Sequence, residues 1–240
     1  GDYDVVITEL GGTVGDIESL PYVETVRQLC WERPDDCAVV HLTLIPYLSA
    51  AGELKTKPTQ HSVKALQESG VFPDLLVCRT EFEINDSIRR KLALFCNVRP
   101  EAVIQSIDAD TIYDVPRLMK EEHLDKVILN KLGLNFTGEA NITHWEEFVY
   151  NLNNPKTSVE IALVGKYVEL KDSYKSISEA FIHASSTSRC KVNLHWVHSE
   201  KLNSVSAAAS LQDMDGVIVA PGFGPRGIEG KFHAVKYARE

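Results

Sequence analysis

A segment rich in lysine, hydroxyl and amide side chains lies between Gly52 and Ser62. It reads Gly-Glu-Leu-Lys-Thr-Lys-Pro-Thr-Gln-His-Ser, which gathers these groups where a loop meets a helix. Lysine supplies charge for a phosphate, hydroxyls and the first amides of a helix supply oriented donors, and glutamine can bond a base or ribose. The segment predicts a nucleotide-phosphate site, although a solvated, proline-capped loop is an equal alternative.

Carboxylates gather around a pair of glycines near the N-terminus. Glu9 ends an apolar run, 4–9, that predicts a buried parallel strand, and Gly11 and Gly12 follow it. Ligands bind beyond the carboxyl ends of strands in open α/β sheets, so Glu9 could hold a Mg²⁺ that bridges phosphates. A turn or capping role is an equal alternative for Glu9, and Asp16 could simply cap the next helix.

Three glycines, Gly222, Gly224 and Gly227, directly follow a predicted strand. Their spacing matches a dinucleotide-binding motif, which would suit an NAD-dependent oxidoreductase. Pro225 removes a backbone donor from the turn where a pyrophosphate would need one. The oxidoreductase is therefore the weaker interpretation.

The composition opposes several classes of protein. The chain has 240 residues and a formal net charge of −9 at pH 7, whereas nucleic-acid-binding surfaces need clustered Lys and Arg. No apolar run is long enough to span a bilayer, so no membrane contact is expected. The five cysteines are scattered and lack paired spacing, which favours a reduced, cytoplasmic compartment over a disulfide framework or zinc site.

The elements that position these residues alternate between strand and helix along the chain. Strands are predicted at 4–9, 37–44, 73–78 and 102–105, and helices at 16–31, before Gly70 and at 86–95. Strand periodicity is lost at 135–158 apart from one helix near 145–151. A second series follows, with strands at 159–164, 191–197 and 216–219 and helices at 174–186 and from 229. The pattern predicts two α/β domains with mostly parallel sheets.

Five segments, in order and with matching spacing, resemble the CTP synthase family. They are 9–19 (ELGGTVGDIES), 52–62, 91–98 (KLALFCNV), 108–113 (DADTIY) and 164–170 (VGKYVEL) followed by 172–176 (DSYKS). The resemblance implies that residues 1–134 are the C-terminal part of a P-loop-type, mostly parallel synthase (amidoligase) domain. Residues 135–158 would then be the linker, and residues 159–240 the N-terminal part of a class I glutamine amidotransferase α/β domain.

The resemblance also implies an activity. In the family ATP phosphorylates the 4-oxygen of UTP, and ammonia released from glutamine displaces the phosphate to give CTP. Mg²⁺ and ATP are then required, GTP is an allosteric activator, CTP is an inhibitor, and a homotetramer completes the pyrimidine-nucleotide site. A nucleotide-binding regulatory or scaffold fragment without catalysis is the alternative.

Roles for single residues come from the same resemblance. Glu9 matches a Mg²⁺ ligand. The segment that contacts inhibitory CTP is matched by Asp16, Ile17 and Glu18. The UTP or CTP site is matched by Lys55, Thr56, Lys57, Pro58, Thr59, Gln60 and Lys91. The stretch that holds the adenine of ATP is matched by Ile107, Asp108 and Ala109. Coupling of the two domains and GTP binding are assigned to Lys166, Tyr167, Lys175 and Arg226, for which a solvated loop is the alternative.

The glycine-rich stretch resembles the amidotransferase loop whose amides form an oxyanion hole, and Gly222 matches the glycine that contacts glutamine. The family usually has Pro-Gly-Gly-Phe-Gly where this chain has Ala220-Pro-Gly-Phe-Gly224, so proline replaces the first glycine. By the resemblance, the P-loop would precede residue 1, and the nucleophilic cysteine with its His and Glu partners would follow residue 240. The chain alone is therefore expected to be inactive.

Overall fold

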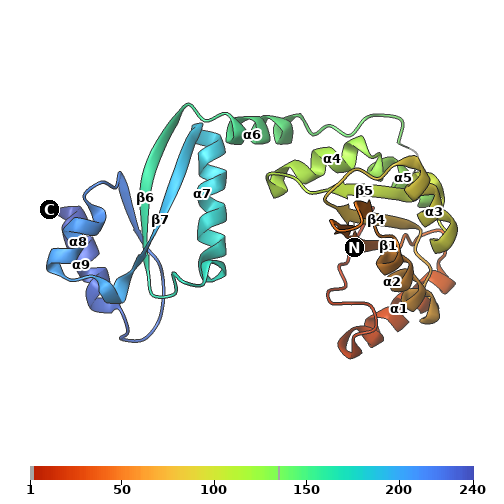
Figure 1. Ribbon diagram of the computed structural model, residues 1–240, viewed down its shortest axis with the longest axis horizontal. Helices are drawn as coiled ribbons and strands as arrows, with labels where there is room; N and C mark the ends of the chain where they lie inside the picture. Colours follow the sequence, from red (N-terminus) through yellow and green to blue (C-terminus); the bar gives the residue numbers. More distant parts are fainter. Residues whose placement is uncertain (1–2, 135) are drawn as a thin grey trace. The chain divides into compact units, whose positions relative to one another are not determined.

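The computed structural model describes residues 3–134 and 136–240, which form two compact units, Gly1–Asn141 and Ile142–Glu240 (Figure 1). Asn135, the first residue of the predicted linker, lies outside the described residues.

A three-stranded parallel sheet, in the order β1-β4-β5, forms the centre of the first unit. Its strands are β1 (Val40–Ile45), β4 (Leu75–Thr80) and β5 (Val103–Ile107). Thr80 of the central strand pairs with Ile45 on one side and Ile107 on the other. The three carboxyl ends therefore lie at one edge, and the predicted parallel α/β architecture is confirmed.

Side chains of β4 alternate between two apolar cores, as the period of a strand requires. Leu76 and Cys78 pack with helices α2 (Lys57–Glu68) and α3 (Asp86–Cys96). Leu75 packs with α4 (Val115–Glu121) and α5 (Leu124–Lys131) on the other face. The sheet is thus covered by a pair of helices on each face, of which α4 and α5 were not predicted from the sequence.

Shorter elements complete the first unit. Helix α1 (Leu20–Glu32) packs through Val23 against the C-terminal end of α2, and a hairpin follows β1. Its strands are β2 (Tyr47–Leu48) and β3 (Glu53–Leu54), joined through Gly52 at a φ of +63°. Single 3₁₀ turns are η1 (Ile17–Ser19), η2 (Pro100–Ala102) and η3 (Ile112–Asp114).

The predicted strand at 4–9 is wrong. The segment has no regular secondary structure, and Ile7 is 92% exposed. The strand predicted at 37–44 is present as β1, but only one of its faces is covered and Leu42 is 70% exposed. Both findings have the same cause, because apolar composition favours a strand but pairing and covering depend on partners distant in the sequence.

The second unit has a parallel sheet, as predicted, and its strand order is β7-β6-β8. Its strands are β6 (Thr157–Gly165), β7 (Cys190–His198) and β8 (Gly216–Val219). Helix α7 (Lys175–Ser188) covers one face, where Leu163 packs with Tyr174 at the end of η4 (Lys171–Tyr174). Helices α8 (Ser204–Leu211) and α9 (Ile228–Arg239) cover the other face, where Val164 is buried (Figure 1). The turn η5 (Ser199–Lys201) follows β7.

Helix α6 (Thr143–Asn153) lies within the predicted linker 135–158 and belongs to the second unit. The Ser186 hydroxyl of α7 donates to the Phe148 carbonyl of α6 over 2.8 Å, which joins the two helices. Among the described residues, no helix combines the length and apolarity needed to cross a membrane.

Candidate functional site

Residues 55–60, here called the phosphate loop, run from the hairpin into the first turn of α2. Thr56 and Thr59 are buried, and the Thr59 hydroxyl donates to the Leu44 carbonyl over 3.2 Å and accepts from Thr43 over 3.1 Å. Thr56 accepts from the Gln60 amide at 3.0 Å. Thr59 therefore holds the helix start to the end of β1, while Lys57 and Pro58 at the helix start are exposed.

Three lysines approach this corner from different elements. Lys55 donates to the Glu53 carboxylate of the hairpin, and Lys91 of α3 also acts on that carboxylate. The bond and charge of Lys55, followed by the charge of Lys91, lower the pKa of Glu53. With exposed Lys57 nearby in sequence, the structure brings a set of cations to the loop, a suitable surface for a polyanion.

The predicted adenine segment begins at the carboxyl end of β5. The Asp108 amide donates to the Thr80 carbonyl at the end of β4 over 2.9 Å, and the Asp108 carboxylate binds Arg79 at 3.0 Å. Ala109 follows directly. Because β1 and β5 flank β4 in parallel register, the phosphate loop and this segment both leave the same edge of the sheet.

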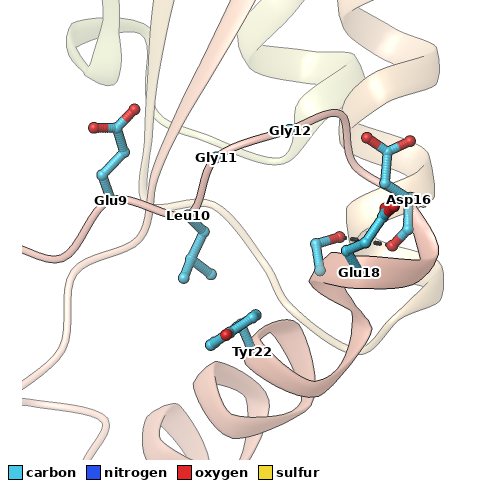
Figure 2. A pocket seen from close by; sticks show the side chains of 8 residues that line it. Glu9, Leu10, Gly11, Gly12, Asp16, Glu18 and Tyr22 are labelled. Atoms are coloured by element: carbon cyan, nitrogen blue, oxygen red, sulfur yellow. Dashed lines mark hydrogen bonds between the residues drawn. The ribbon is translucent and has the colours of Figure 1, made fainter. Parts of the chain in front are cut away.

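An open pocket of about 380 Å³ lies beside the N-terminal glycine turn, lined by Glu9, Gly12, Asp16, Glu18, Tyr22 and their neighbours (Figure 2). Asp16 folds back so that its carboxylate accepts the Thr13 amide at 2.8 Å, and Gly12 adopts a φ of +87° above it. Glu9 lies at one end of the turn, with Asp16 and Glu18 at the other (Figure 2). The predicted metal and CTP residues thus line one pocket, except Ile17, which is exposed outside its lining.

The surroundings of Glu9 decide whether it could serve as a Mg²⁺ ligand. Its side chain is exposed and forms no hydrogen bond or ion pair with any described residue, so both oxygens are accessible. Within the described chain, no three His, Cys, Asp or Glu side chains form a metal-binding cluster. Mg²⁺ commonly takes one or two carboxylates together with water and phosphate oxygens. Glu9 fits as one such carboxylate.

Residues 220–227, here called the amide loop, connect β8 with α9. Lys166, which follows β6 and is only 4% exposed, donates to the Phe223 carbonyl. Lys231 of α9 donates to the Ala220 carbonyl over 2.8 Å. A Cβ atom on Gly222 would lie 2.9 Å from Lys166 Cε and 3.7 Å from Lys231 Nζ. The loop is therefore held from two sides by lysines.

Aromatic and charged side chains surround Lys166. The Tyr174 hydroxyl accepts from the backbone amides of Lys166 at 3.1 Å and Tyr167 at 3.4 Å. The Arg226 guanidinium lies 5.1 Å from the centre of the Tyr167 ring and pairs with Glu200 at 3.0 Å. Three of the predicted coupling residues thus meet at the amide loop. The fourth, Lys175, is exposed and pairs instead with Glu179 on its own helix at 2.6 Å.

Comparisons with known proteins fit both units. A family model described as CTP synthase N-terminus matches residues 1–134, and one described as glutamine amidotransferase class-I matches residues 169–240. The chain belongs to the CTP synthase family. The CTP synthases of Christiangramia forsetii and Flavobacterium psychrophilum are 65% and 64% identical to it over 241 residues. That of Porphyromonas gingivalis is 56% identical over 238 residues.

These alignments cover the chain almost completely but the relatives only in part. They include 100%, 100% and 99% of this chain, and 44%, 45% and 44% of the three CTP synthases. The chain thus spans less than half the length of these relatives. Neither matched description is that of an NAD-dependent oxidoreductase, so the dinucleotide interpretation of the three glycines gains no support.

The five cysteines of this CTP synthase family member are free thiols. Burial raises the pKa of Cys78 to about 12 and that of Cys96 to about 11, which opposes thiolate formation. Burial, followed by the proximity of Cys37, also raises the pKa of Cys30. These three thiols lack the activation that a nucleophile needs.

Sequence reasoning missed Lys231 and Tyr174. Both contact the backbone rather than offering an exposed group. Tyr174 lies in the segment 172–176 that resembles the family, but no role was assigned to it there. Gly165 carried an indirect signal for Tyr174, because a Cβ there would come within 2.5 Å of the Tyr174 hydroxyl. A glycine that ends a buried strand can indicate such a close approach.

Proposed function

We propose that this chain is the middle part of a glutamine-hydrolysing ligase that converts UTP to CTP with ATP. The observation that carries the proposal is the conformation of the phosphate loop and the exposure of its lysine. Thr56 and Thr59 are buried, Thr59 bonds to the Leu44 carbonyl, and Lys57 is exposed at the first turn of a helix, where backbone amides also attract phosphate. The names of the relatives and both family matches support the same activity.

Each loop has a separate part in this proposal. Lys55 to Gln60, with Lys91, bind the phosphates of UTP or of inhibitory CTP. Asp16, Ile17 and Glu18 contact the inhibitor. Ile107, Asp108 and Ala109 hold the adenine of ATP through the backbone at the same sheet edge. Glu9 contributes one carboxylate to a Mg²⁺ ion that neutralises phosphate charge.

The amide loop serves the release of ammonia. Gly222 contacts glutamine, and backbone amides of the loop stabilise the negative charge that develops on the attacked amide. Lys166, Tyr167 and Arg226, with Lys175, couple this unit to the nucleotide unit and contribute to GTP activation. A cytoplasmic homotetramer completes the proposal, with a neighbouring subunit closing the pyrimidine-nucleotide site.

Nucleotide binding can be measured on the chain as it stands. We expect UTP and CTP to raise its melting temperature, since a ligand stabilises by RT ln(1 + [L]/Kd), and we expect NAD to leave it unchanged. A shift with NAD but none with UTP or CTP would contradict the proposal.

The catalytic claim needs the remaining parts of a family member. We define the chimeric enzyme as the CTP synthase of Christiangramia forsetii in which this chain replaces the matching 241 residues. It should form CTP from UTP, ATP and glutamine, with Mg²⁺ required, and light scattering should report a tetramer in the presence of nucleotide. Nucleotide binding without CTP formation would favour the regulatory or scaffold alternative.

A further inference from the structure

Two lysines bind the amide loop without a carboxylate partner. Lys166 and Lys231 each donate to a loop carbonyl, those of Phe223 and Ala220. Among the residues that the structure describes, neither lysine forms an ion pair. An ammonium group with little exposure needs strong acceptors to offset its lost hydration, and here the acceptors are two backbone oxygens of one loop. The hydrogen bonds of both ammonium groups therefore depend on the conformation of that loop.

Peptide geometry converts the carbonyl contacts into a direction for an amide. In a trans peptide the C=O and N–H groups lie in one plane and point in opposite directions across the C–N bond. The peptide that carries the Phe223 carbonyl also carries the Gly224 N–H. Because Lys166 binds that oxygen, the Gly224 N–H is directed away from Lys166. Lys166 thus fixes the orientation of one potential oxyanion donor.

The other lysine fixes an earlier peptide of the loop, the one between Ala220 and Pro221. The Ala220 carbonyl belongs to the bond before Pro221, whose ring restricts φ to about −65° and which lacks an N–H. With this peptide anchored by Lys231, Gly222 is the flexible joint between the two bound carbonyls. Gly222 also leaves the space that both lysine side chains fill, since a Cβ atom there would come 2.9 Å from Lys166 Cε.

We propose that Lys166 and Lys231 are positioning residues that clamp the amide loop in the conformation that glutamine hydrolysis needs. The proposal rests on the glutamine-hydrolysing function proposed above and assigns the two side chains that hold the loop in place. Pro221 has no N–H, and both lysines hold the loop through backbone carbonyls.

The pKa of Lys231 indicates that the ammonium groups of Lys166 and Lys231 lie close together. Burial lowers the pKa of Lys231, and the positive charge of Lys166 lowers it further. Two ammonium groups beside one loop also make its surroundings favourable to a developing negative charge.

Amide NMR on the chain tests the clamp without any catalysis. Lys166→Met and Lys231→Met keep an apolar side chain of similar length but remove the donor. We expect both to increase the motion and hydrogen exchange of the Phe223 and Gly224 amides, while the amides of β6 and α7 stay as in the parent. Lys231→Arg should partly restore the order. Lys236→Met, an exposed lysine on the same helix, is the matched control and should change nothing.

Kinetics of the chimeric enzyme test what the clamp contributes to glutamine hydrolysis. A misplacement of about 1 Å can lower a rate about 100-fold, so Lys166→Met and Lys231→Met should each reduce kcat for glutamine hydrolysis by about 10- to 100-fold with little change in KM. CTP synthesis with added ammonia should stay at the parent level, because the nucleotide unit is intact.

The two proposals fail in different ways. A parent chimeric enzyme that binds nucleotide but cannot hydrolyse glutamine would refute the function and leave the NMR result to decide on the clamp. Loop amides that stay ordered in both methionine variants would refute the clamp, whatever the activity. An equal loss of glutamine- and ammonia-dependent synthesis would also refute it, because it would indicate a general loss of structure.

Discussion

Lysines have different surroundings at the phosphate loop and at the amide loop. In the phosphate loop, the buried Thr59 hydroxyl holds the helix start to the Leu44 carbonyl, and Lys57 is exposed. In the amide loop, the nearly buried Lys166 holds the backbone together with Lys231, and Phe223 is 99% exposed. A lysine in a loop is therefore a candidate ligand group in one unit and a structural donor in the other. Burial, not residue type, separates the two roles.

The glycines of the two units should differ most in their tolerance of a side chain. A Cβ atom on Gly230 in α9 would lie 1.7 Å from the Ser199 carbonyl oxygen, a backbone atom that cannot rotate away. We expect Gly230→Ala to destabilise the second unit by ~3 kcal/mol or more, at the upper end of overpacking costs. Hydrogen exchange of β6 and β8 amides measures this.

Gly52 in the first unit is the matched control. Its φ is +63°, but the nearest atom to a Cβ would be the Tyr47 hydroxyl at 3.9 Å. Gly52→Ala should cost only the strain of left-handed backbone, about 1–2 kcal/mol. Equal losses for the two variants would show that close packing does not distinguish these two glycines.

Lys57→Ala tests the exposed lysine of the phosphate loop. Loss of a charge-assisted hydrogen bond to phosphate should weaken UTP and CTP binding about 10- to 100-fold. Stability should change by less than about 0.5 kcal/mol, as for other surface positions. Calorimetry with each nucleotide measures the affinity, and Lys64→Ala, at an exposed position of the same helix, should leave it unchanged. Unchanged affinity in Lys57→Ala would remove this lysine from the site.

Thr59→Val tests the opposite role in the same loop. Valine has nearly the same shape but leaves the Leu44 carbonyl and the Thr43 hydroxyl without their partner at a position that is 0% exposed. We expect a loss of about 1–3 kcal/mol in the stability of the first unit. Hydrogen exchange of α2 amides should report it. A stable variant with weakened UTP binding would mean that Thr59 contacts the ligand directly.

Much of the fold was predictable because most elements have a clear local pattern. The buried strands β4, β6 and β8 and the amphipathic helices α2 and α3 lie where the periodicity placed them. Helix α8 was missed because its run of serines and alanines gives little contrast between faces. A signal was present, since Asn203 caps its start by accepting from the Val205 and Ser206 amides. The wrong strand at 4–9 shows that pairing is not a local property.

The site was predictable at the level of segments rather than contacts. The motif at 52–62 correctly predicted a loop-to-helix junction with exposed Lys57, but nothing in its spacing revealed that Thr56 and Thr59 turn inward. Lys231 lies 11 residues beyond its partner Ala220, and only the return of α9 across the sheet brings them together. Side-chain burial and long-range contacts follow from tertiary packing, which a single sequence does not display.

Acid should loosen the phosphate loop and spare the amide loop. Helix α2 is attached to β1 through His41 Nε2 and the Ser62 hydroxyl, 2.9 Å apart, and burial lowers the pKa of His41 below its ordinary value of 6.5. As the pH falls below 6.5, His41 gains a proton more readily in the unfolded chain than in the folded chain, and this favours unfolding. The contribution of neutral His41 to stability is therefore present above pH 6.5 and is lost as the pH falls through the lowered pKa. The amide loop is attached through the backbone carbonyls of Ala220 and Phe223, which do not titrate in this range.

Hydrogen exchange of α2 and of the amide loop between pH 7 and 5, corrected for intrinsic rates, separates the two attachments. We expect α2 protection to fall with the pH and the protection of the amide loop to stay constant. His41→Gln, which keeps a polar group but cannot gain the charge, should flatten the α2 profile, whereas His61→Gln at an exposed position of the same helix should not. A parallel fall in both loops would mean that general acid destabilisation, not His41, controls the first unit.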